Sequence, residues 1–167
     1  MCSSDLNPVK AAEIYGMFGT GWALMQFLFS PLQGALSDRF GRRTVILISC
    51  TGLGLDFLLM ALAPNLKWLF VGRIISGICA ASISTAGAYI ADVTPAEKRA
   101  AAFGMIGAAF GIGFVLGPFV GGVLGHFGAR LPFWVAAAMA LVNVSYGYFV
   151  LPESLPKEKR GTFSWKK

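Results

Sequence analysis

The sequence has 167 residues, of which 56% are hydrophobic and 13% charged, and its mean hydropathy is +0.66. This composition excludes an ordinary soluble domain and predicts a membrane-embedded chain, with room for roughly four to six spanning helices of about 20 residues each. The net charge of +6 does not indicate nucleic-acid binding, because the basic residues lie between apolar runs rather than on one shared face.

Apolar runs bounded by charges or turn residues predict an all-α membrane protein, a bundle of five transmembrane helices. No strand is expected, because in lipid each segment must satisfy its own backbone hydrogen bonds. The runs cover about 11–36, 44–63, 66–91, 100–124 and 133–151. The predicted organisation is therefore a segment 1–10, a bundle 11–151 and a polar, basic tail 152–167.

The basic residues are divided unequally between the two ends of these helices. Ten Lys and Arg lie in the loops 37–43 and 92–99 and in the tail, and three lie at the opposite end. Because cytoplasmic loops retain positive charge, we expect a bacterial inner-membrane protein whose tail is cytoplasmic. The first run then starts outside, which predicts a preceding helix. Residues 1–6 resemble a translated sequencing adapter, so we expect a non-native start and a chain that is a fragment; an ordinary extracytoplasmic segment is the alternative.

Gln26 lies in the middle of the first run, and the loop after this run holds a dense charge cluster. An amide offers two donors and an acceptor, which can serve a substrate or a neighbouring helix. In "GALSDRFGRRTV", Asp38, Arg39, Arg42 and Arg43 fall within six positions. The arginines are typical of a cytoplasmic topological signal, but that rule does not explain Asp38, since acids contribute little to orientation.

The second and third runs each contain an ionisable residue. Asp56 is the acid in the apolar part of the second run, where a carboxyl can bind a proton or a substrate cation. A neutral, hydrogen-bonded Asp or a hydrated one near the interface is the alternative. Arg73 lies about seven residues into the third run, where a charge costs roughly 2.5–3.5 kcal/mol near the helix centre. It faces a cavity or a partner, or it reaches the headgroups by snorkelling.

The fourth run is rich in glycines at intervals of four, a spacing that lets a neighbouring helix approach closely. Pro118 within this stripe favours a kink. Close packing alone is enough to explain the glycines. The single histidine, His126, is expected in a solvated loop, and Cys2, Cys50 and Cys79 are too widely spaced for a metal site, so no enzyme is expected.

Several segments together resemble the major facilitator superfamily. "GALSDRFGRRTVIL" resembles the family's loop between helices two and three, "GRIISGICAA" its fourth-helix pattern, and "GFVLGPFVGG" its fifth-helix antiporter pattern. "LDFLLMALAP", "YIADVTPAEKR" and "FGMIGAAFG" are similar to the tetracycline-efflux branch. The resemblance covers about 11–153. It implies helices two to six in the N-terminal half of a twelve-helix transporter, which moves a drug outward while protons move inward.

The resemblance also implies roles for particular residues. The position of Asp38, at the end of a long helix just before Arg39 and Gly41, fits a latch that pairs with nearby arginines or with a helix N-terminus in one conformational state, and we expect its partner in the absent second half. No cofactor is implied beyond the proton gradient; the implied partners are lipid, a small-molecule substrate, and the first helix and C-terminal half of the same protein. A metabolite or sugar transporter of this family, or a helical module that does not transport, remains an alternative. The candidate residues are Gln26, Asp56 and Arg73 for substrate and proton coupling; Gly34, Asp38, Arg39, Gly41, Arg42 and Arg43 for a conformational-switch loop; and Gly113, Gly117, Pro118, Gly121 and Gly122 for the antiporter motif.

Overall fold

The computed structural model describes residues 8–156, and this part of the chain is helical without a strand, which confirms the predicted all-α class. Residues 1–6, and the tail from 157 on, lie outside the described residues. The elements are α1 (Pro8–Phe40), α2 (Arg42–Leu62), α3 (Leu66–Ala80), α4 (Ile83–Val93), the 3₁₀ turn η1 (Ala96–Lys98), α5 (Arg99–Phe127) and α6 (Leu131–Val150).

Local chemistry explains where the first helices begin and end. Gly41 alone separates α1 from α2, and its φ of 98° lies in the region that glycine adopts without a steric penalty. Pro64 follows the end of α2 closely. The side chain of Asn65 then accepts a hydrogen bond from the backbone N–H of Trp68 at 3.3 Å, which caps the start of α3.

Four helical segments of the described chain are long and apolar enough to cross a bilayer. They are Arg42–Leu62, Leu66–Val93, Ala96–Phe127 and Leu131–Val150. Helix α1 is longer than any single crossing needs, at 33 residues, but it is less apolar, since Gln26 and Gln33 interrupt its apolar run. That α1 crosses the membrane therefore stays a prediction.

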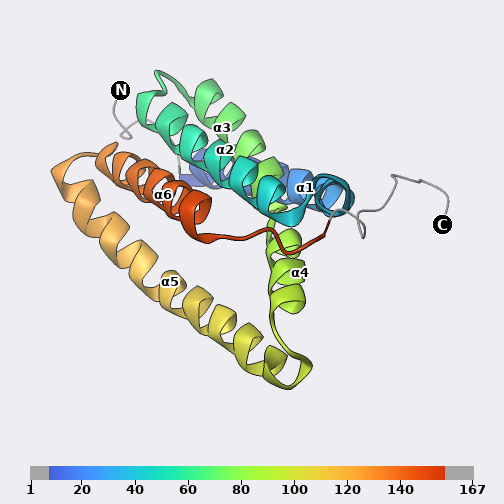
Figure 1. Ribbon diagram of the computed structural model, residues 1–167. Helices are drawn as coiled ribbons and strands as arrows, with labels where there is room; N and C mark the ends of the chain where they lie inside the picture. The colour runs from blue at the N-terminus through green and yellow to red at the C-terminus, as the bar shows by residue number, and fades with distance from the viewer. Residues whose placement is uncertain (1–7, 157–167) are drawn as a thin grey trace.

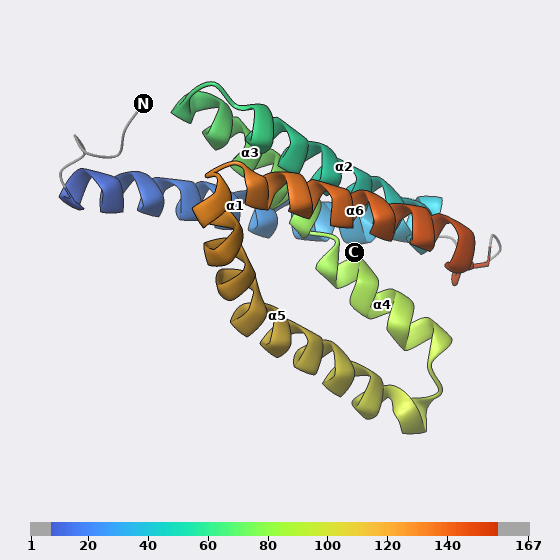
Figure 2. The same ribbon diagram turned by 90° about the vertical axis from the view of Figure 1, so that its left-hand side faces the viewer.

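The third predicted helix, 66–91, is not continuous. Its backbone breaks after α3, where Ala81 N donates to Ile78 O at 3.3 Å and Ser82 N to Cys79 O at 3.2 Å. Such tight turns leave carbonyl groups without their usual helical partners. Gln33 of α1 satisfies one of them, because its Nε2 donates to Ile78 O at 2.6 Å. The break thus separates α3, which packs on α1 and α2, from α4, which points away from them (Figures 1 and 2).

Helices α1, α2, α3 and α6 form the packed part of the chain. Helix α2 lies along α6 on one side and along α3 on the other, and α3 also packs on α1 (Figure 1). Gly77 makes the α1–α3 approach possible, because a Cβ at this position would lie 2.6 Å from the carbonyl oxygen of Trp22. Helix α5 instead runs apart from this bundle, joined to it through α4 and α6 (Figure 2), and none of its residues is buried.

Candidate functional site

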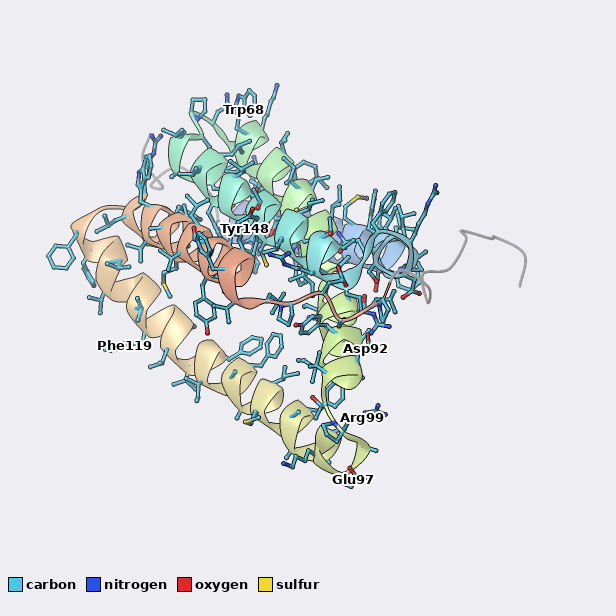
Figure 3. The ribbon with its side chains drawn as sticks, viewed as in Figure 1. Trp68, Asp92, Glu97, Arg99, Phe119 and Tyr148 are labelled. Atoms are coloured by element: carbon cyan, nitrogen blue, oxygen red, sulfur yellow. The ribbon has the colours of Figure 1, made fainter. Side chains whose placement is uncertain are left out.

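A charge cluster centred on Arg42 lies at one end of the bundle. Arg42 Nη1 is 2.8 Å from Oδ2 of Asp92, a residue at the end of α4 (Figure 3). Arg42 Nη2 is 3.8 Å from Asp38 Oδ1. The side chains of Arg42, Asp92 and Asp38 are 14%, 30% and 61% exposed. The Arg42–Asp92 pair is therefore the shorter and better shielded of the two, and the Asp38 pair is largely hydrated.

The segment that follows α6 crosses the same end of the bundle. Glu153 Oε1 accepts from the backbone N–H of Arg42 at 2.9 Å and from that of Leu155 at 3.2 Å. Ser154 Oγ donates to Asp92 Oδ2 at 3.3 Å. A carboxylate at the first turn of α2 both satisfies a free N–H and complements the positive end of the helix dipole. The start of α2, the end of α4 and the exit of α6 are thereby joined in one network.

Sequence reasoning missed Asp92, Glu153 and Ser154 as members of this network. The signal for them was indirect: both "ADVTPAEKR" and "LPESLPKEKR" follow apolar runs on the side that the basic residues predict to be cytoplasmic. Tyr89 was also missed; its hydroxyl donates to Pro152 O at 3.0 Å and fixes the exit segment to α4. Contacts between residues 62 to 111 positions apart cannot be predicted from local spacing in the sequence.

The remaining residues of the predicted switch loop turn the chain or point elsewhere. Gly41 N donates to Ser37 O at 3.0 Å, and the Ser37 side chain donates through Oγ to Gly34 O at 2.7 Å, so the last turn of α1 is hydrogen-bonded within itself. Arg39 stacks on the ring of the adjacent Phe40, with 5.2 Å from its guanidinium carbon to the ring centre. Of the loop arginines, Arg42 is the one whose guanidinium pairs with acids among the described residues.

Asp56 is deeply buried, with a side chain that faces α3. The residue is 2% exposed, and neither carboxyl oxygen has a hydrogen-bond partner in the described part of the chain. A Cβ at Gly72 would lie 2.8 Å from Asp56 Oδ1, so only glycine leaves room for this carboxyl. Arg73 is the next residue, but no ion pair within 4.0 Å joins it to Asp56 among residues 8–156. The hydrogen-bonded alternative for Asp56 therefore finds no support in the described contacts.

Gln26 of α1 is half-buried. It lines a shallow hollow of about 430 Å³ together with Ala23, Phe27, Ser30 and Pro31, all of them on α1. Within residues 8–156 no hydrogen bond or ion pair connects Gln26 with Asp56 or Arg73. The structure thus places the three predicted coupling residues on three helices without joining them, and their shared role stays a prediction.

The predicted antiporter motif lies on α5, which continues through Pro118. A Cβ added at Gly113, Gly117, Gly121 or Gly122 would meet nothing within 4 Å in the described chain. The close helix approach that the glycine spacing predicts is thus not made by any residue from 8 to 156. The role of these glycines therefore stays a prediction.

A polytopic helical membrane protein is the class that this fold and this charge cluster define. The chain belongs to the Major Facilitator Superfamily, whose family model matches residues 6–167. It is 48% identical over 149 residues to "Tetracycline resistance protein, class C" of Escherichia coli, covering 89% of this chain and 38% of that protein. It is 37% identical over 150 residues to "Multidrug resistance protein 2" of Bacillus subtilis (strain 168), covering 89% of this chain and 38% of the other.

A solved structure agrees with this assignment. The human organic anion transporter MFSD10 (TETRAN) superposes with a TM-score of 0.80 at 34% identity, over 87% of this chain and 33% of that one. The family resemblance found in the sequence is thereby confirmed, including its tetracycline-resistance branch. The chain spans 33–38% of the length of these relatives.

Proposed function

We propose that this chain is helices two to six of a proton-coupled drug efflux transporter of the bacterial inner membrane, with its tail in the cytoplasm. The similarity to proteins named for tetracycline and multidrug resistance supports the drug substrate. The excess of basic residues at one end of the helices supports the orientation. The proposed protein is a transporter and not an enzyme, driven by the proton gradient without a cofactor.

The buried carboxyl of Asp56 is the observation that carries the proton coupling. An ionised carboxylate without a hydrogen-bond partner is costly in an apolar interior, and binding of a proton removes that charge. A conformational change that opens the α2–α3 contact to water, or brings the guanidinium of Arg73 closer, favours the ionised form of Asp56 and releases the proton. Proton binding and helix arrangement are coupled in this way. Gln26 adds a hydrogen-bonding amide toward the substrate.

The charge cluster supplies the conformational switch in this proposal. Arg42 holds α4 to the start of α2 through Asp92, and Glu153 attaches the exit of α6 to the same point. These contacts stabilise the arrangement in which the start of α2, the end of α4 and the exit of α6 are held together. Asp38 is mostly exposed and pairs with Arg42 only at 3.8 Å, so in this proposal it exchanges that contact for one with the second half of the complete protein. The glycines of α5 take part as a packing surface for that half or for the first helix.

A matched pair of variants of the full-length protein tests the proton role. Everted membrane vesicles that contain the protein should take up tetracycline when a proton gradient is present, and Asp56→Asn should abolish this uptake, because the amide cannot release a proton. Glu13→Gln is the control, since it removes an exposed carboxylate near the start of α1. Gradient-driven uptake that survives in Asp56→Asn would refute the role of Asp56.

An organic anion is the second candidate substrate, because the matching solved structure is that of an organic anion transporter. The same vesicles distinguish the two candidates. Competition of gradient-driven tetracycline uptake by amphiphilic cations and zwitterions, but not by organic anions, supports drug efflux. Uptake of a labelled organic anion without uptake of tetracycline supports the alternative.

A further inference from the structure

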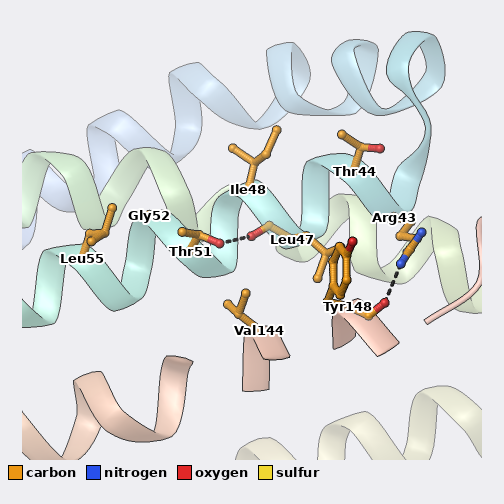
Figure 4. Close-up of a pocket in the computed structure, with 9 residues that line it drawn as sticks. All are labelled: Arg43, Thr44, Leu47, Ile48, Thr51, Gly52, Leu55, Val144 and Tyr148. Carbon is orange, nitrogen blue, oxygen red and sulfur yellow. Dashed lines mark hydrogen bonds between the residues drawn. The ribbon is translucent and has the colours of Figure 1, made fainter. Parts of the chain in front are cut away.

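A groove of about 600 Å³ lies between α2 and α6, outside the charge cluster described above. Apolar side chains from both helices form its walls, including Ile48, Leu55 and Val144, and one arginine, Arg43, stands at its end (Figure 4). From Thr44 to Leu55, helix α2 rises about 16 Å. This length is about half of the 30 Å hydrocarbon core of a bilayer, so the groove is as long as one leaflet is thick.

The walls of the groove are apolar along their length. The Thr51 hydroxyl donates to Leu47 O at 2.8 Å, so its polar atom is satisfied within the helix and its methyl group is left for the groove (Figure 4). Ile48 is 66% and Leu55 57% exposed. A hydrocarbon chain fits such a surface, because it covers apolar area and has no polar group that needs a hydrogen bond.

The guanidinium of Arg43 is fixed at the end of this groove by Tyr148. Arg43 Nη2 donates to Tyr148 O at 2.5 Å, and the guanidinium carbon lies 5.5 Å from the centre of the Tyr148 ring (Figure 4). The carbonyl of Tyr148 is available because the residue four positions later is Pro152, which has no N–H to donate. The arginine thereby completes the last turn of α6 and is held in one orientation.

Most donors of this guanidinium remain unused by the protein. A guanidinium has five N–H donors. In Arg43, Nη2 donates to Tyr148 O and Nε is buried without a partner among the described residues, so the two N–H groups of Nη1 and the second N–H of Nη2 are the donors left for a ligand. Arg43 is also the one charged residue among those that line the groove, and Thr44, which is exposed, lines it as well. A guanidinium at the end of an apolar groove that is as long as one leaflet is thick is complementary to an anionic phospholipid.

We propose that this groove binds one anionic phospholipid, with its phosphate on the guanidinium of Arg43 and an acyl chain along α2. The leaflet is the one that meets the charged loops of the chain. The lipid would connect the start of α2 with the end of α6 from the membrane side. This site does not depend on the transported substrate or on proton coupling, so it can be tested without a transport assay.

Lipid retention by the full-length protein tests the proposal. The protein is delipidated in mild detergent and titrated with phosphatidylglycerol or phosphatidylcholine, and bound lipids are counted by native mass spectrometry. Arg43→Gln should weaken phosphatidylglycerol binding about tenfold, because the charge-assisted hydrogen bonds are lost. Arg39→Gln is the matched control and should change the affinity less than twofold, since Arg39 belongs to the same loop but does not line the groove. Equal losses in both variants, or equal affinity of the unaltered protein for the two lipids, would overturn the site.

A second variant tests the apolar part of the groove independently of the charge of Arg43. Val144→Trp should fill the apolar part and lower retention of phosphatidylglycerol, even if Arg43→Gln fails to fold as judged by gel filtration; unchanged retention in Val144→Trp contradicts the proposal. Soluble glycerol phosphate should not compete with the lipid at equal concentration. Effective competition by it would show a phosphate site that needs no acyl chain, which would also overturn the lipid assignment.

Discussion

Replacing Asp92 with Asn should destabilise the bundle more than the same change at Asp38, although Asp38 is the acid of the recognisable loop motif. Asp92 lies 2.8 Å from the Arg42 guanidinium and also accepts from Ser154. Asp38 lies 3.8 Å from Arg42 and is 61% exposed. Water competes with the longer pair, so the shorter pair carries more of the interaction.

The exposed fractions set the expected magnitudes. Exposed ion pairs contribute about 0–1 kcal/mol, and removing one partner of a fully buried pair costs about 3–5 kcal/mol. Arg42 and Asp92 are 14% and 30% exposed, so their pair is intermediate, and Asp92→Asn should cost about 1–3 kcal/mol. Asp38→Asn should cost less than about 0.5 kcal/mol.

Thermal unfolding of the full-length protein in detergent measures the difference in stability between the Asp92→Asn and Asp38→Asn variants. Cys50 and Cys79 lie in α2 and α3 as free thiols, and a thiol-reactive dye reports their exposure as the helices separate. At roughly 2–4 °C per kcal/mol, Asp92→Asn should lower the midpoint by about 2 to 12 °C and Asp38→Asn by less than about 2 °C. Equal shifts, or a larger one for Asp38→Asn, would refute the inference that Arg42 depends mainly on Asp92. In the double variant with Arg42→Gln, the added cost of Asp92→Asn should largely vanish.

Three further substitutions test contacts of the same bundle, two by the same unfolding measurement and one by the yield of folded protein. Glu153→Gln should cost about 1 kcal/mol, because the charged acceptor at the start of α2 is lost; an unchanged midpoint would show that water replaces it. Gly77→Ala should lower the yield of folded protein strongly, since its methyl group would lie 2.6 Å from Trp22 O, whereas Gly87→Ala, whose methyl would have 3.8 Å to its nearest neighbour, should be tolerated. Gln33→Met should cost about 1–2 kcal/mol through the lost hydrogen bond to the α3 end, and a neutral result would mean that the break needs no support from α1.

The helices were predictable from sequence to the extent that their signals are local. The ends of α2 are placed within about two residues by two local signals. One is the glycine between "SDRF" and "RRTV" before the apolar run, and the other is Pro64 after it. The break after Ala80 was not predictable, because the stretch "CAASIS" has no proline or glycine. What supports the break is a hydrogen bond from Gln33, 45 positions away, which depends on how α1 packs on α3.

The candidate site was predictable in its residues more than in its contacts. Asp56 and Arg42 stand out because charges are costly in apolar runs and concentrated in loops, and the structure finds the first buried and the second paired. Their neighbours come from distant parts of the chain: Gly72 faces Asp56, and Asp92 pairs with Arg42. Spacing also directed attention to the glycines of α5, whereas the tightest glycine contact with a backbone atom among the described residues is at Gly77.

Simultaneous measurement of drug and proton movement tests the proposed transport most directly. The full-length protein is reconstituted in liposomes that contain a pH-sensitive dye, and tetracycline is added to one side without an imposed gradient. Proton-coupled antiport predicts that tetracycline entry drives protons out, that an imposed pH gradient drives tetracycline against its own gradient, and that Asp56→Asn abolishes both fluxes. Tetracycline movement that leaves the internal pH unchanged and does not respond to a gradient would contradict it.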